Sequence, residues 1–212
     1  MIPQLIIGLD PGHGGEDTGC IFGDFREADW TWALAERVIQ LLCATSWPLT
    51  LKLSRCDRDH DPSLEDRAAA MAMAKADFVI SLHANATSDL REHGALGFHV
   101  DGLQSTVGFC EALLTTLNRP GEYAQTISGP LMPMRSQIHI ATQLDLHGAP
   151  SWKRRPWNVL HWHRRPAALI EYGYASNPVE RTWLLSETGR DACAWATVEG
   201  IRKMLLTKKM LN

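Results

Sequence analysis

Three side chains suited to metal binding or acid–base chemistry follow apolar runs of the chain. They are His13, His83 and Glu171, and the apolar runs before them cover residues 5–9, 78–82 and 167–170. Continuous apolar runs of this length are typical of strands that are covered on both faces of a sheet. Because ligands bind at the carboxyl edge of an open α/β sheet, the three side chains should meet there. Two histidines and a carboxylate at one edge predict a zinc hydrolase.

A further metal ligand is predicted at Glu27, fourteen residues after His13. A catalytic zinc site has about three protein ligands and one position open for water. The glycines around His13 would let the backbone approach a metal closely. Taken alone, Glu27 is better explained as an acidic residue that favours a helix N-terminus, and His83 as a hydrogen-bonded histidine. Their expected position at one sheet edge favours the ligand set His13, Glu27 and His83.

Glu171 is predicted to act as an acid and base. A carboxylate that ends an Ala-Ala-Leu-Ile run needs a compensating interaction in apolar surroundings. A salt bridge to Arg67 or Arg55 is the structural alternative. As a general base, Glu171 would take a proton from water and return it to a leaving amine, and partial burial would raise its pKa toward neutrality.

Composition predicts one globular domain without a basic field for nucleic acid. The 212 residues are 45% hydrophobic and 21% charged, with a formal net charge of −3. No basic segment precedes the first short apolar run, so no signal peptide is predicted. No apolar run approaches the roughly 20 residues of a membrane span. The five cysteines form no C-x-x-C pair and are predicted to be reduced thiols of a cytoplasmically made protein.

Apolar runs alternate with helical patterns and predict an α/β fold. Candidate strands are residues 5–10, 49–54, 78–83, 95–100, 157–161 and 167–172. Candidate helices lie near 27–42, after Asp61-Pro62-Ser63, near 105–118 and near 190–207. This order is typical of a single domain with a mostly parallel, six-stranded twisted sheet and helices on both faces. The proline-rich stretch 119–156, with a short helix predicted around 135–147, is interpreted as a functional segment or a small insertion.

Four motifs occur in the order of a known family. They are Leu9–Gly15 (LDPGHGG), Glu27, Ser81–Ala86 (SLHANA) and Glu171–Glu180 (EYGYASNPVE). With Leu53-Ser54-Arg55, Asp57 and Ser63–Arg67 (SLEDR), they closely resemble the zinc-dependent N-acetylmuramoyl-L-alanine amidases of the Amidase_3 type. The resemblance covers nearly the whole chain.

The resemblance implies a role for each site residue. His13, Glu27 and His83 would bind one Zn²⁺ ion, and Glu171 would be the catalytic carboxylate. The implied reaction is hydrolysis of the amide bond between N-acetylmuramic acid and L-alanine in peptidoglycan.

Some parts of the chain depart from the family pattern. Cys20 and Tyr174 stand where alanine and phenylalanine are common, and residues 119–156 match poorly. The long autoinhibitory helical insertion of cell-division members is not recognised between the second histidine and the catalytic glutamate. Its absence implies an enzyme that needs no activator.

Two further features have alternative interpretations. Residues 151–165 hold five Lys/Arg and three Trp. They form either a solvated charge run or a platform for the acidic, sugar-bearing wall polymer, with nucleic acid as a third option. Asn85 is predicted to orient a ligand or hold substrate, with a turn cap as the alternative.

The preferred interpretation is a monomeric zinc amidase that acts on peptidoglycan, with residues 1–212 as one catalytic domain and no separate cell-wall-binding domain. The missing export signal predicts a phage or prophage endolysin, made in the host cytoplasm and released through a holin. A zinc carboxypeptidase or aminopeptidase on a similar fold would instead release free amino acids. A non-catalytic peptidoglycan-binding relative would lack a zinc ligand or the catalytic carboxylate. Neither nucleic acid binding nor membrane insertion is predicted.

Overall fold

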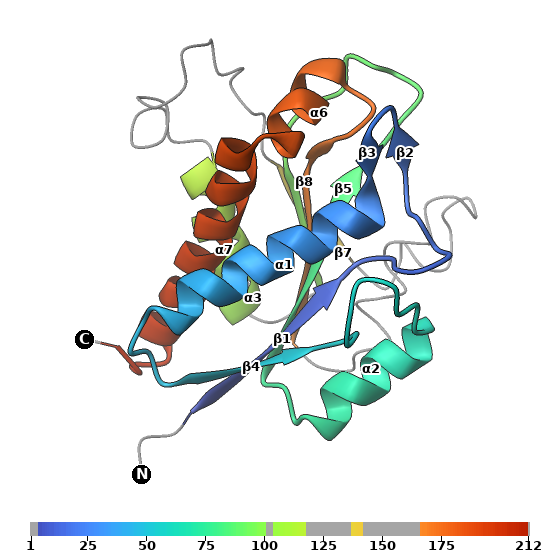
Figure 1. The fold of residues 1–212 in the computed structure, drawn as a ribbon. Helices are drawn as coiled ribbons and strands as arrows, with labels where there is room; N and C mark the ends of the chain where they lie inside the picture. Colours follow the sequence, from blue (N-terminus) through green and yellow to red (C-terminus); the bar gives the residue numbers. More distant parts are fainter. Residues whose placement is uncertain (1–3, 101–103, 118–136, 142–165, 212) are drawn as a thin grey trace.

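A six-stranded sheet forms the centre of the molecule (Figure 1). The computed structural model describes residues 4–100, 104–117, 137–141 and 166–211. The strands, in sheet order, are β4 (Leu49–Leu53), β1 (Leu5–Pro11), β5 (Phe78–Asn85), β8 (Ala167–Tyr174), β6 (Leu96–Val100) and β7 (Gln137–Ala141). The pairs β4–β1, β1–β5, β5–β8 and β6–β7 are parallel, and β6–β8 is antiparallel. The predicted mostly parallel α/β sheet is therefore confirmed.

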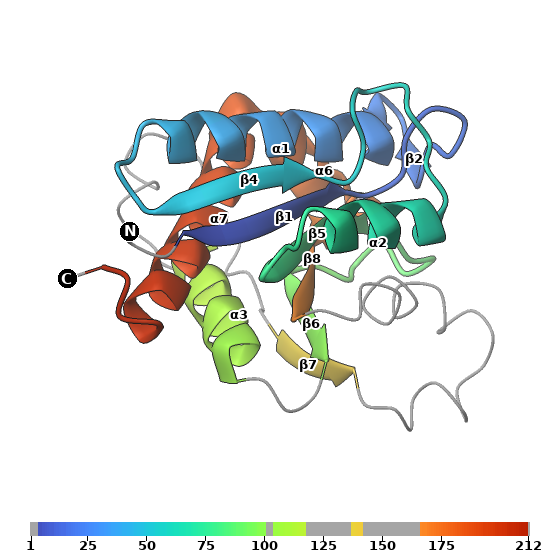
Figure 2. The same cartoon turned by 90° about the horizontal axis from the view of Figure 1, so that it is seen from below.

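Helices cover both faces of the sheet (Figure 2). On one face lie α1 (Glu27–Cys43), α3 (Gln104–Leu117) and α7 (Glu187–Thr207), and on the other lies α2 (Leu64–Met73). Alternate strand residues serve the two layers: Ile80 and Leu82 belong to the larger core, and Val79 packs in the smaller core with Met71 of α2. Burial of each such side chain contributes about 1.5–3 kcal/mol, which fixes the register of the strands.

The carboxyl edge of the parallel strands carries the residues that the sequence singles out. His83 lies at the end of β5, directly in register with Glu171 of β8. His13 lies in the turn after β1. A short hairpin of β2 (Ile21–Phe22) and β3 (Phe25–Arg26) leads straight into α1, whose first residue is Glu27.

The structure corrects the predicted elements in several places. The helix predicted around 135–147 is wrong at residues 137–141, which form β7. Gln-Ile-His-Ile-Ala alternates polar and apolar residues, a period of two that suits a strand. The hairpin β2–β3 and helix α6 (Pro178–Leu185) were not predicted. The predicted strand 157–161 and the basic aromatic residues 151–165 lie outside the described residues.

Helix α6 had a recognisable signal in the sequence. The Asn177 side chain caps it by accepting the backbone N–H groups of Val179 and Glu180, and Pro178 occupies the first turn. Among the described residues, no helix is both long enough and apolar enough to cross a membrane.

Candidate metal centre

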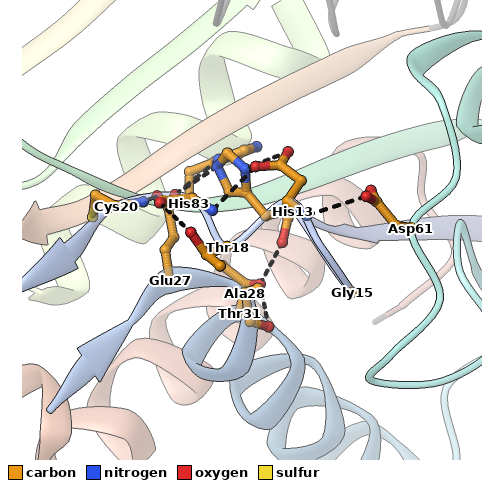
Figure 3. Close-up of polar contacts among 12 residues, drawn as sticks. His13, Gly15, Thr18, Cys20, Glu27, Ala28, Thr31, Asp61 and His83 are labelled. Atoms are coloured by element: carbon orange, nitrogen blue, oxygen red, sulfur yellow. Dashed lines mark hydrogen bonds and ion pairs between the residues drawn. The ribbon is translucent and has the colours of Figure 1, made fainter.

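His13, Glu27 and His83 meet at the carboxyl edge of the sheet (Figure 3). Glu27 Oε1 lies 3.3 Å from Nε2 of His13 and 3.1 Å from Nδ1 of His83. One ligand atom from each residue can be chosen so that all three lie within 4.8 Å of one another. The two imidazole rings stand nearly perpendicular, with their centroids 5.1 Å apart. The structure thus brings together the three residues that the sequence predicts as metal ligands.

The His83 ring is positioned by its own strand, β5, and by the turn after β1 that contains Gly12. The register of β5 with β8 shifts after His83, because Asn85 pairs with Tyr174 and β8 holds one residue more than β5 over this stretch. The ring lies so close to Gly12 that a Cβ atom there would collide with it. The second ring nitrogen, Nε2, is buried and has no hydrogen-bond partner.

Glu27 is a buried carboxylate with a full set of partners. Only 4% of the residue is exposed. Oε2 accepts the backbone N–H of Cys20 at 3.0 Å, and Oε1 accepts that of Ala84 at 3.0 Å. Burial raises the pKa of Glu27, but hydrogen bonds and charges of His13 and His83 lower it further, so the net pKa is below its usual value. The carboxylate is therefore held ionised, as metal coordination requires.

His13 lies in an unusual backbone conformation that a buried arginine supports. Its φ is 61°, a region that non-glycine residues rarely adopt. Arg67 of α2 donates to the carbonyls of His13 and Pro11, at 2.6 and 2.8 Å. Thr31 of α1 donates to the carbonyl of Gly12 at 2.7 Å. The turn is thus held from both faces of the sheet.

The charge of Arg67 is balanced by Asp10, the buried carboxylate of β1. Their side chains lie 2.9 Å apart, and Asp10 also accepts the hydroxyls of Ser54 and Ser81 at 2.5 and 2.7 Å. Arg55 instead donates to backbone carbonyls, including that of Pro11 at 3.2 Å. The alternative in which Arg67 or Arg55 forms a salt bridge to Glu171 finds no support among the ion pairs of the described residues.

Asp17 is a further polar partner of His13. Its Oδ2 lies 2.8 Å from His13 Nδ1, on the opposite side of the ring from Glu27. Burial lowers the pKa of His13, but hydrogen bonds and charges of Glu27 and Asp17 raise it more, to about 9. The same pairing lowers the pKa of Asp17, although its burial acts in the opposite direction. Without a metal, His13 is therefore a cation between two carboxylates.

Glu171 is buried beside this cluster and has an unsatisfied oxygen. It is 8% exposed, and its Oε2 is buried without a hydrogen-bond partner. Burial, and next the negative charge of Glu27, raise the pKa of Glu171 well above its usual value, while His13 lowers it. A carboxyl group that protonates readily can hold and return a proton.

The donor set fits a zinc ion. Two imidazoles and one carboxylate are ligands that catalytic zinc sites use, and they leave a further coordination position. The unpartnered nitrogen of His83 and oxygen of Glu171 are the kind of buried polar atoms that a missing ion or water explains.

The structure also places the residues about which the sequence left a choice. Asn85 lies at the end of β5, and its Oδ1 accepts the N–H of Ala86 at 2.8 Å, which agrees with the turn alternative. Asp17 was not predicted as a neighbour of the site, and Arg67 was considered only as a salt-bridge partner of Glu171. An aspartate four residues after His13 was a signal for the first, whereas the contact of Arg67 with His13 depends on the packing of α2 and has no local signal.

Comparisons with known proteins agree with this geometry. The Amidase_3 family profile, described as N-acetylmuramoyl-L-alanine amidase, matches residues 7–203. The chain is 29% identical to the N-acetylmuramoyl-L-alanine amidase CwlM of Mycobacterium tuberculosis, over 95% of this chain and 45% of that protein. It is 26% identical to the endolysin of Bacillus phage SPP1, over 96% of this chain and 67% of that protein. The chain thus spans less than half the length of the mycobacterial relative.

A solved structure shares the fold. The catalytic domain of CwlV, an N-acetylmuramoyl-L-alanine amidase from Bacillus (Paenibacillus) polymyxa var. colistinus, superposes with a TM-score of 0.74 at 20% identity, covering 98% of this chain and 100% of that one. The family profile spans all four motifs and the metal cluster. The chain therefore belongs to the Amidase_3 family of N-acetylmuramoyl-L-alanine amidases.

Proposed function

We propose that this chain is a zinc-dependent hydrolase of the amide bond between N-acetylmuramic acid and L-alanine in peptidoglycan. The observation that carries the proposal is the buried Glu171 next to the cluster of His13, Glu27 and His83. In this proposal the three clustered residues hold one zinc ion, and Glu171 moves the proton.

The proposed mechanism divides the chemistry between the ion and the protein. A bound zinc ion supplies a Lewis acid that polarises a carbonyl and lowers the pKa of water. Glu171 accepts the proton that water loses when it attacks the amide carbon. Glu171 then gives that proton to the nitrogen of L-alanine as the carbon–nitrogen bond breaks, because an amine leaves more readily than an amide anion. Its burial supports this role, since burial raises the pKa of the carboxyl group toward the working range.

The substrate proposal includes a contact at Asn85. Its side chain lies at the end of β5, two residues after the ligand His83, and is partly exposed. An amide side chain there offers both a donor and an acceptor to a peptide bond of the stem. The proposed partner is the muramyl peptide of the wall, and the proposed working form is a monomer.

An endolysin is the proposed biological role. The similarity to the endolysin of Bacillus phage SPP1 supports it. Such an enzyme, made in a bacterial cytoplasm, should be tolerated until a holin opens the membrane, and should then cause rapid lysis without an activator protein. An absolute requirement for an activator would instead indicate a regulated housekeeping amidase.

Metal analysis tests the site directly. The purified protein should contain one zinc per chain, and chelation should abolish cleavage of isolated peptidoglycan. His83→Ala should lose the metal, because two protein ligands rarely hold a catalytic zinc. His60→Ala is the matched control, since His60 is exposed and lies outside the cluster. Full zinc occupancy in a folded His83→Ala variant would contradict the ligand assignment.

A further inference from the structure

Asp17 contacts the proposed ligand His13 on the side of the ring that faces away from Glu27. The distances are 2.8 Å from Asp17 Oδ2 to His13 Nδ1 and 3.3 Å from His13 Nε2 to Glu27 Oε1. We propose that Asp17 is a positioning residue that fixes the tautomer and orientation of the His13 ring for metal binding. The inference rests on the proposed zinc site and extends it by one residue.

The hydrogen-bonding chemistry of the pair determines which ring nitrogen can bind a metal. An ionised carboxylate only accepts hydrogen bonds, so His13 Nδ1 must carry the hydrogen that Asp17 accepts. In the neutral ring the other nitrogen, Nε2, then has the free electron pair. That nitrogen is the one that faces Glu27. Asp17 thus selects the tautomer whose free nitrogen points into the ligand cluster.

The Asp17 side chain can orient the ring because the loop holds Asp17 itself in place. Its second carboxylate oxygen accepts the N–H of Gly19 at 3.1 Å, and its own N–H donates to Asp61 at 3.1 Å. Its carbonyl accepts the N–H of Gly14 at 2.8 Å. Backbone and side chain are thus both fixed relative to the turn that carries His13.

The position of Asp17 at the surface separates orientation from folding. Its side chain is 57% exposed, so truncation leaves no cavity in the core. Carboxylate partners of metal-binding histidines typically contribute 10–100-fold to metal affinity, because they hold the ring and raise its basicity. Removal of Asp17 should therefore weaken zinc binding much more than it affects the fold.

Substitutions of two aspartates test this inference. Zinc affinity is measured by competition with a chelator for wild type, Asp17→Asn and Asp17→Ala. Asp24→Asn and Asp24→Ala are the charge-matched controls, since Asp24 is exposed at the turn between β2 and β3. Asp17→Ala should bind zinc about 10–100-fold more weakly. Asp17→Asn keeps a neutral acceptor and should fall between Asp17→Ala and wild type, while both Asp24 variants should match wild type.

Two further readouts distinguish orientation from a structural role. The circular dichroism spectrum of the metal-free Asp17→Asn protein should match that of Asp24→Asn, as expected if the fold is intact. In zinc-loaded protein, NMR should show a protected Nδ1 proton on His13 in wild type and its loss or rapid exchange in Asp17→Ala. Unchanged zinc affinity in Asp17→Ala, with wild type binding zinc normally, would overturn this inference alone. Failure of wild type to bind zinc would overturn the proposed function as well.

Discussion

Glu27 and Glu171 are two buried carboxylates whose surroundings shift their pKa values in opposite directions. Both are desolvated, which raises the pKa of each. Glu27 has two imidazoles against it, and they lower its pKa overall. Glu171 instead experiences the negative charge of Glu27, which raises its pKa further. Pairs of this kind divide roles in an active site: one group stays ionised and the other exchanges protons.

Replacement of Glu171 by glutamine should separate metal binding from catalysis. Glutamine keeps the size of the side chain but cannot accept or return the proton. Glu171→Gln should retain zinc and the fold and lose activity by about 10²-fold or more. Turnover measured on isolated peptidoglycan, with Glu65→Gln on the exposed face of α2 as the control, checks this. Near-wild-type turnover in Glu171→Gln would make Glu171 a structural residue.

The high pKa of His13 predicts how zinc binding depends on pH. The ring of His13 has a pKa of about 9 in the metal-free protein, so it must release a proton before it can bind a metal. Zinc affinity should therefore fall as pH decreases below 9, by about one order of magnitude per pH unit near neutrality. Calorimetry in buffers of different ionisation enthalpy should detect close to one released proton per zinc at pH 7.5.

The stability of the metal-free protein should depend on pH in the opposite sense. His13 has a higher pKa in the folded chain than the value of about 6.5 expected in the unfolded chain. The contribution of His13 to the free energy of unfolding is thus fully present below pH 6.5 and is lost as pH rises toward 9. Zinc binding that is independent of pH from 6.5 to 9 would contradict the protonated state assigned to His13.

The ends of the parallel strands could be predicted from the sequence, whereas the loops between the strands could not. The apolar runs that end at His83 and Glu171 placed both side chains at one edge because parallel strands share their direction. The turn of His13 depends instead on Arg67, which reaches it from α2 and which no local pattern reveals. The sequence does not predict strand β7, because five alternating residues among prolines are too short a segment to distinguish a strand from a helix.

Gly12, in the turn after β1, lies against His83 of β5, so a substitution there tests how these two elements form the site. A Cβ atom at Gly12 would collide with the ring of His83. Gly12→Ala should therefore displace the ring and weaken zinc binding at least tenfold, since ligand geometry limits affinity. Gly108→Ala in α3 is the matched control, because a Cβ there meets open space. Titration with zinc checks both variants, and wild-type affinity in Gly12→Ala would show that the ring adapts.

The role of the basic aromatic stretch 151–165 in wall binding remains a prediction, because the stretch lies outside the described residues. If this stretch binds the anionic wall, replacement of Arg154, Arg155, Arg164 and Arg165 by glutamine should weaken binding to cell walls. The loss should be largest at low salt, because salt above about 0.15 M screens exposed charges. Turnover on a small soluble muropeptide should barely change. Co-sedimentation with purified walls measures the binding, and unchanged binding at low salt would leave the stretch a solvated face.

Mass spectrometry of the products from purified peptidoglycan shows directly which bond the enzyme cuts. An amidase releases intact stem peptides that begin with a free L-alanine amino group, and leaves glycan strands whose muramic acid carries a free carboxyl group. We expect these two products, and we expect them to disappear after chelation. Free amino acids with stem peptides still attached to the glycan would contradict the account and identify a peptidase on this fold. Intact peptidoglycan with zinc-loaded protein bound to it would identify a non-catalytic binding domain.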